Sequence, residues 1–164
     1  IDPFYLSWKA REIGIPTKFI ELAGEVNHQM PIIVVDKVAT ALNEDGISLK
    51  GANVLVVGIA YKPNVDDIRE APAATIIEDL IDRGAKVQYH DPHIPDFPNM
   101  RKHDISLSSV ELTPDCLSGF DAVLIVTDHD AIDWNVIAMH ASLVIDTRNA
   151  LAGCVDIRAR LVKA

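Results

Sequence analysis

The stretch "VLVVGIAYKPNVDDIREAPA" (residues 54–73) determines the expected fold class. A strand is predicted over 53–60, where an apolar run follows Asn53, and the chain then turns near Gly58 and leads into a helix predicted over 71–84. A continuous Val/Ile/Leu run without polar alternation is typical of a strand that is buried on both faces of a parallel sheet. The stretch therefore predicts the strand, the turn and the helix that open a β-α-β unit.

The same alternation of strand and helix patterns continues to about residue 150. A strand followed by a turn is predicted over 86–92, further strands over 121–129 and 141–149, and further helices over 114–119 and 130–140. Such alternation indicates an α/β protein with helices on both faces of the sheet and right-handed crossovers. We therefore predict a Rossmann-like, doubly wound parallel sheet over residues 49–164. The pattern of the tail over 154–164 favours a helix, to which we assign no role.

The first part of the chain, residues 1–48, has the pattern of helices alone. A short helix is predicted near residues 4–10, and apolar residues recur at helical spacing over 17–30 and again over 31–46. Pro31 should break or bend this long run, and Gly46 should end it. Because its apolar residues occupy more than one face and no sheet of its own needs covering, we interpret it as a dimerisation or interdomain segment. A plain helical bundle packed on the following domain is the alternative.

Composition and charge restrict the partners. The chain has a net charge of −9, which disfavours a general nucleic-acid or anionic-membrane surface. It contains no run of about 20 apolar residues that could span a membrane. Two cysteines without a pairing pattern fit a reduced, cytoplasmic setting. The chain starts without methionine, at a helix start formed by Asp2 and Pro3, so we expect a fragment of a longer protein.

Three cations follow predicted strands, where open α/β sheets bind their ligands. Lys62 and Arg69 follow the first strand and Arg148 follows the fourth. Lysine and arginine beside a helix N-terminus favour a phosphate or diphosphate group. The alternative is that Arg69 pairs with a neighbouring carboxylate (Asp66, Asp67 or Glu70) and that Lys62 is only solvated.

Other chemistries fit the sequence less well. There is neither a G-x-G-x-x-G fingerprint nor a P-loop, and the first strand lacks the acidic pair that a phospho-receiver domain needs after it. The residues His90, Asp91, His93, His103 and Asp104 match no familiar metal-ligand spacing, so a polar turn is the preferred interpretation of "HDPH". Cys116 and Cys154 are expected to be structural. Trp8 and Trp134 are expected to fill a core or an interface.

Five ordered segments together resemble one family. They are "IDPFYLSWKA" (1–10), "FIELAGEVN" (19–27), "LKGANVLVVGIAYKPNVDDIREAPA" (49–73), "YHDPHIP" (89–95) and "VIDTRNAL" (144–151). They resemble the C-terminal part of the UDP-glucose/GDP-mannose dehydrogenases, and among these the UDP-N-acetylhexosamine 6-dehydrogenases. The resemblance covers nearly the whole chain, and its ordered motifs are far more specific together than any one alone.

The resemblance implies a two-step oxidation of a sugar C6 alcohol to a carboxylate, with NAD as cofactor and a cysteine that forms a thioester. By the family's register this cysteine precedes Asp2 by four residues and is outside the chain, so the fragment alone should be inactive. Asp2 matches the acidic residue that assists the cysteine. Lys62 and Arg148 match cations that contact the UDP-sugar, and Arg69 matches an arginine that reaches the NAD phosphates.

The resemblance also implies a homodimer formed through the N-terminal helices. Ile1 stands where some branches have lysine, which favours an N-acetylhexosamine substrate over UDP-glucose. A nucleotide-binding or dimerisation module without redox chemistry is the alternative. A glycine-rich strand-turn-helix and a glycine-flanked cysteine upstream of Ile1 would favour the enzyme over this alternative.

Overall fold

The computed structural model describes residues 2–164, and the side chains from residue 3 onward. Five strands form one sheet in the order β2-β1-β3-β4-β5, and every neighbouring pair is parallel. The strands are β1 (Asn53–Val57), β2 (Lys86–His90), β3 (Ala122–Ile125), β4 (Leu143–Asp146) and β5 (Arg160–Lys163). This arrangement confirms the predicted α/β fold with a doubly wound parallel sheet.

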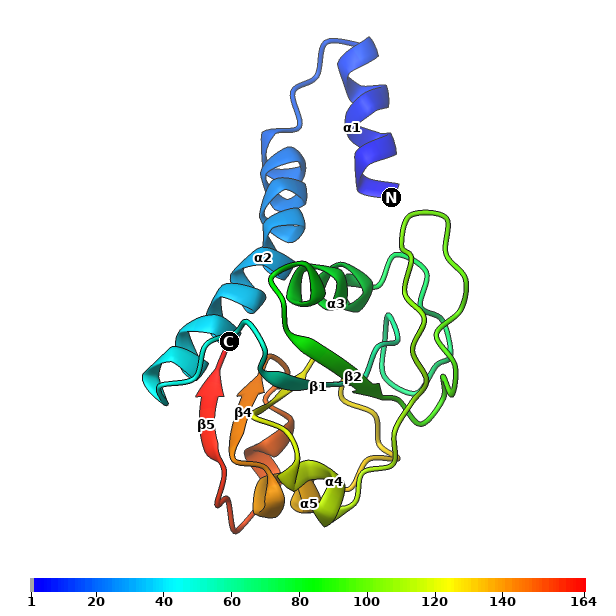
Figure 1. Cartoon of the computed structure of the whole chain (residues 1–164). Coiled ribbons are helices and arrows are strands. Elements are labelled where there is room, and N and C mark those ends of the chain that lie inside the picture. The colour runs from blue at the N-terminus through cyan, green and yellow to red at the C-terminus, as the bar shows by residue number, and fades with distance from the viewer. Residues whose placement is uncertain (1) are drawn as a thin grey trace.

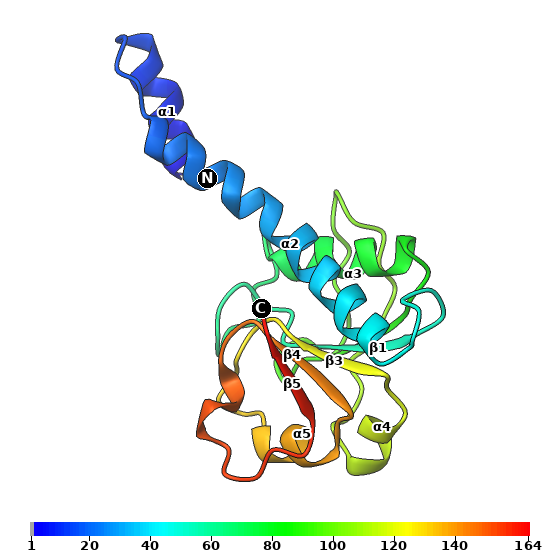
Figure 2. The ribbon, with the colours of Figure 1, turned by 90° about the vertical axis from the view of Figure 1, so that its left-hand side faces the viewer.

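Helices cover both faces of the sheet, while α1 lies away from it (Figure 1 and Figure 2). The helices of the described residues are α1 (Asp2–Glu12), α2 (Lys18–Glu44), α3 (Pro72–Asp82), α4 (Pro114–Ser118) and α5 (Trp134–His140), with a 3-10 turn η1 (Ala150–Gly153). Helices α2 and α3 lie on one face, and α4 and α5 on the other (Figure 1). The central strands β1 and β3 are therefore buried on both sides, which explains why their sequences are apolar without alternation.

The break expected at Pro31 does not occur, whereas a bend there stays a prediction. The long helix α2 continues through this proline, although its nitrogen cannot donate to the carbonyl one turn earlier. Its second half buries Val34, Val35, Val38 and Leu42 in the core that it shares with α3 and the sheet. The expectation that this helix covers no sheet is therefore wrong for its second half. The division of the chain at residue 48 stays a prediction.

The C-terminal tail contains the strand β5, so the helix expected over 154–164 is wrong. Strand β5 extends the sheet beside β4, with Leu161 in register with Val144. Arg160 joins this edge strand to the end of α2, where its guanidinium pairs with Glu44 at 3.0 Å and Asp45 at 2.9 Å. The tail thus fixes the sheet-covering half of α2 against the sheet.

The first half of α2 and the helix α1 form an arm that extends away from the sheet (Figure 2). The two helices pack closely, since a Cβ placed on Gly24 would lie 2.3 Å from the Phe4 ring. The arm nevertheless exposes large apolar side chains, with Phe19 87% and Trp8 56% accessible. Within residues 2–164, no helix has the length and apolar character that crossing a bilayer requires.

Candidate functional site

The turn after β1 determines the shape of the candidate site. Gly58 has a φ of +75°, and a Cβ at this position would lie 2.0 Å from the Thr127 carbonyl oxygen. Its N–H donates to the carbonyl of His90 at the end of β2. The carboxyl ends of β1, β2 and β3 are therefore drawn together at this one glycine.

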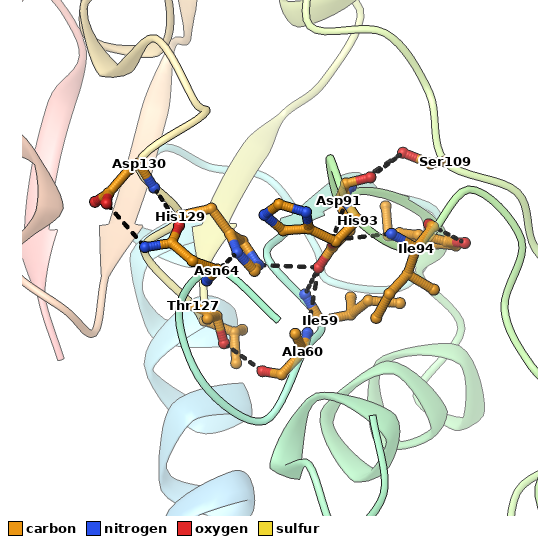
Figure 3. A network of polar contacts seen from close by, with 12 residues as sticks. Ile59, Ala60, Asn64, Asp91, His93, Ile94, Ser109, Thr127, His129 and Asp130 are labelled. Atoms are coloured by element: carbon orange, nitrogen blue, oxygen red, sulfur yellow. Dashed lines mark hydrogen bonds and ion pairs between the residues drawn. The ribbon is translucent and has the colours of Figure 1, made fainter. Parts of the chain in front are cut away.

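A buried carboxylate, Asp91, lies at the centre of this edge (Figure 3). Its Oδ2 accepts hydrogen bonds from the backbone N–H groups of Ile59 (2.7 Å) and Ala60 (3.2 Å). Its Oδ1 accepts from the N–H groups of His93 (2.8 Å) and Ile94 (3.2 Å). Asp91 is only 3% exposed, so the segment predicted to be a polar turn contains a buried link between β1 and β2.

His129, which is fully buried, connects this carboxylate to the loop after β1 (Figure 3). Its Nδ1 lies 3.0 Å from the backbone N–H of Asn64, and its Nε2 lies 3.1 Å from Asp91 Oδ2. Because a backbone N–H can only donate, Nδ1 must be the unprotonated acceptor and Nε2 must carry the proton. The imidazole is therefore neutral, and burial lowers its pKa although the Asp91 carboxylate opposes that shift.

Further contacts attach the loop after β1 to the end of β3. The Asn64 side chain and Asp130 exchange two hydrogen bonds, from Asn64 Nδ2 (2.8 Å) and from the Asp130 N–H (2.9 Å). The Thr127 hydroxyl donates to the Ala60 carbonyl at 2.7 Å. Asn64 itself has a φ of +62°, a left-handed conformation that asparagine tolerates better than most residues. These contacts give the loop that carries Lys62 one defined position.

Lys62 and Arg148 lie on the two sides of the carboxyl end of β3. Lys62 is exposed, and its Nζ lies 5.6 Å from the centre of the Tyr61 ring. Arg148 is also exposed, but its Nε donates to the Val126 carbonyl at 2.7 Å, which directs the guanidinium along the sheet edge. Neither cation is paired with a carboxylate among the described residues. Both are therefore available to an anion.

Arg69 is already paired. Its guanidinium makes a two-bond contact with the Asp67 carboxylate, with distances of 2.9 and 2.8 Å. This contact, with a further hydrogen bond from the Arg69 backbone, lowers the pKa of Asp67 to about 2. The structure thus contains one of the neighbouring pairs that the sequence left open for Arg69. These two bonds use Nε and Nη2, so the N–H groups of Nη1 can still donate to a phosphate while the pair stays intact.

Two other predictions from the sequence concern Asp2 and the histidine-rich turn. Asp2 begins α1, but its side chain lies outside the described residues. In the described part of the chain, no three His, Cys, Asp or Glu residues are grouped to hold a metal. His103 instead contacts Glu78 at 2.6 Å. Cys116 and Cys154 are free, and Cys154 has a raised pKa because of its partial burial.

The sequence interpretation included Asp91 and His129 among the strand-end positions but gave neither a role in the site. The signal that could have found them is their position, since each lies one to four residues beyond the end of a strand. They are 38 residues apart in the sequence and meet only because β1 lies between β2 and β3. The fold and the edge define a class: a doubly wound α/β domain with exposed cations, Lys62 and Arg148, at its strand ends.

Comparison with known proteins identifies the family. Residues 55–153 match the UDP binding domain of the UDP-glucose/GDP-mannose dehydrogenase family. A UDP-N-acetyl-D-mannosamine dehydrogenase of Methanococcus maripaludis is 34% identical over 159 residues, which cover 92% of this chain and 34% of that protein. A UDP-glucose 6-dehydrogenase of Rickettsia bellii is 34% identical over 142 residues, covering 84% and 32%.

A solved structure agrees with these sequence matches. The UDP-N-acetyl-mannosamine dehydrogenase of Staphylococcus aureus superposes with a TM-score of 0.71 at 25% identity, covering 99% of this chain and 36% of that one. The chain belongs to the UDP-glucose/GDP-mannose dehydrogenase family. It spans about a third of the length of the relatives that it matches.

Proposed function

We propose that this chain binds the UDP part of a UDP-sugar, with the diphosphate between Lys62 and Arg148. The observation that carries the proposal is the pair of cations without a carboxylate partner on the two sides of the β3 end, inside the segment that matches the family's UDP binding domain. In a chain with a net charge of −9, placed cations offset the cost of removing a diphosphate from water.

The proposed reaction of the whole protein is the NAD-dependent oxidation of the sugar C6 alcohol to a carboxylate. NAD would accept the hydride, and a cysteine outside this chain would hold the thioester. Asp2 would assist that cysteine as an acid or base. The sequence has no dinucleotide fingerprint, and the Gly58 turn is filled by the Thr127 carbonyl. Arg69 is therefore the only contact to NAD that we propose here, and this chain alone should be inactive.

The proposed substrate is a UDP-N-acetylhexosamine. The sequence resemblance supports this choice, as does the relative from Methanococcus maripaludis, which covers 92% of the chain against 84% for the UDP-glucose enzyme of Rickettsia bellii. Titration with UDP-N-acetylglucosamine, UDP-N-acetylmannosamine and UDP-glucose compares the three sugars.

Replacing Lys62 and Arg148 together with alanine tests the binding site. Each charge-assisted contact contributes about 1.5 kcal/mol or more, so the double variant should bind UDP about 100-fold more weakly in calorimetric titration. The matched control is Lys86→Ala with Arg158→Ala, which removes the same charge from the opposite, amino-terminal edge of the sheet. It should change the affinity by less than about threefold at physiological salt, where charges beyond about 8 Å are screened. Failure of the unaltered chain to bind UDP, or equal losses in both double variants, would reject the proposal.

We also propose a homodimer formed through the arm. One face of α2 carries exposed apolar residues at helical spacing, with Phe19, Leu22, Val26 and Met30 lining a shallow groove. Exposed apolar patches of this kind mark protein–protein contacts. Replacing Leu22 and Val26 with glutamate should weaken association at least about tenfold, since burying an unpaired charge is costly.

Sedimentation equilibrium measures this association. Gln88→Glu with Asn99→Asp is the control, because it adds two negative charges at exposed positions outside the arm and replaces no apolar residue. A monomeric unaltered chain, or an unchanged dimer in the double glutamate variant, would contradict the proposed interface.

A further inference from the structure

We infer that His129 is a positioning residue for the UDP diphosphate, an inference that rests on the proposed function. Its Nδ1 accepts the hydrogen bond of the Asn64 N–H, and this contact holds the loop of residues 61–66 that carries Lys62. His129 is fully buried and cannot contact the diphosphate itself. It acts by fixing the position of the loop and so of Lys62.

The loop needs such an anchor because it has little burial of its own. All of residues 61–66 are exposed, and the loop includes Asn64 with its left-handed backbone. A segment without buried apolar contacts opens at low free-energy cost unless its hydrogen bonds fix it. The side-chain contacts between Asn64 and Asp130 are themselves exposed, so water competes with them.

His129 is the buried end of this attachment. Its ring is fully buried, and Asp91 fixes its orientation through Nε2 while the His93 ring packs against it edge to face at 4.9 Å. The hydrogen bond on one ring nitrogen sets the tautomer and therefore the role of the other. Asp91 thus links the ends of β1 and β2 to His129, whose other nitrogen, Nδ1, holds the loop.

Protonation of His129 would abolish the anchor, because a second N–H would then face the N–H of Asn64. The charged or titratable groups around the ring are Asp91, His93 and Asp128. The folded-state pKa is lowered by burial, so the unfolded chain binds a proton that the folded chain excludes. The contribution of this site to stability is therefore complete above the ordinary histidine pKa of about 6.5 and is lost as the pH falls below it.

Two substitutions of His129 test the roles of its two ring nitrogens separately. In His129→Gln, the side-chain amide can reach the place of Nε2 and still donate to Asp91, but no acceptor remains for Asn64. In His129→Asn, the shorter side chain places its oxygen near Nδ1, so the acceptor for Asn64 remains and the donor to Asp91 is lost. Asp91 is buried and Asn64 is at the surface, so His129→Asn should be the less stable variant.

UDP affinity should follow the opposite order. We expect His129→Gln to bind UDP about tenfold more weakly than the unaltered chain, and His129→Asn to stay within about threefold, as one lost hydrogen bond implies. Calorimetric titration measures the UDP affinity, and urea unfolding the stability, of the unaltered chain, His129→Gln and His129→Asn. If affinity instead follows stability, so that His129→Asn binds worst, His129 is merely structural and the inference is wrong.

Hydrogen exchange of the Asn64 amide, followed by NMR, distinguishes failure of this inference from failure of the proposed function. Exchange should be at least about tenfold faster in His129→Gln than in His129→Asn. If the unaltered chain binds no UDP, the proposed function fails and the diphosphate role of His129 fails with it, whatever the exchange rates. If UDP binds but the exchange rates of the two variants are equal, only the anchoring by Nδ1 is rejected.

Discussion

Replacing Gly58 with alanine should lower the free energy of unfolding by about 3–5 kcal/mol, which few single substitutions do. The methyl group would lie 2.0 Å from the Thr127 carbonyl oxygen and 2.7 Å from its carbonyl carbon. Both contacts are to backbone, so no flexible side chain can move aside. Relief would require β1 and β3 to separate where the sheet is fully buried, which costs more than the left-handed backbone itself.

Gly46→Ala is the matched control for that substitution. Gly46 has the same φ of +75°, but a Cβ there meets no atom within 4 Å. Its cost should therefore be the backbone penalty alone, about 1–2 kcal/mol. Urea denaturation followed by circular dichroism measures both variants. Equal losses would mean that the Thr127 contact contributes nothing and that only the backbone conformation at Gly58 matters.

The sheet was predictable because its central strands are buried on both faces. The runs around β1 and β3 are continuously apolar, and α3 follows β1 after the predicted turn. The predicted strand over 141–149 ends earlier, at Asp146, because that carboxylate accepts hydrogen bonds from the N–H groups of Arg148 and Ala150. The boundary thus depends on a buried polar contact that an apolar pattern does not indicate.

The roles of α2 and the tail were not predictable from local pattern. Strand β5 has only four residues and is half-buried at the sheet edge, so its apolar pattern is too short to distinguish strand from helix. The second half of α2 covers the sheet through apolar packing with strands distant in sequence, and Arg160 adds a contact to Asp45, 115 residues away. Both features arise from tertiary contacts rather than from helix or strand propensity.

The candidate site also contains residues that were predictable from the sequence and residues that were not. Lys62 and Arg148 could be placed at the strand ends because each follows a predicted strand, and the structure places both at that edge. The network of Asp91 and His129 could not be derived, since its members meet only through the strand order. Their contacts show that the predicted polar turn "HDPH" is partly a buried support for the loop that carries Lys62.

Replacing Asp91 with asparagine should lower the free energy of unfolding by about 3–5 kcal/mol, the cost of disrupting a buried charged contact. Both carboxylate oxygens accept hydrogen bonds in the folded chain, while an amide offers only one acceptor. Asp96→Asn is the control, since Asp96 is exposed on the same connection and its side chain accepts, among the described residues, from Ser108 alone. Its cost should be within about 0.5 kcal/mol in urea denaturation.

Neither orientation of the new amide can satisfy the site. With its NH2 group at the place of Oδ1, it faces the N–H groups of His93 and Ile94. With its NH2 group at the place of Oδ2, it faces the N–H groups of Ile59 and Ala60, and His129 would have to move its proton to Nδ1, against the N–H of Asn64. The variant should therefore lose stability and UDP affinity together, unlike His129→Gln, which should lose mainly affinity. An Asp91→Asn protein as stable as Asp96→Asn would mean that the buried carboxylate adds no net stability, and that its assigned role in joining β1, β2 and His129 is wrong.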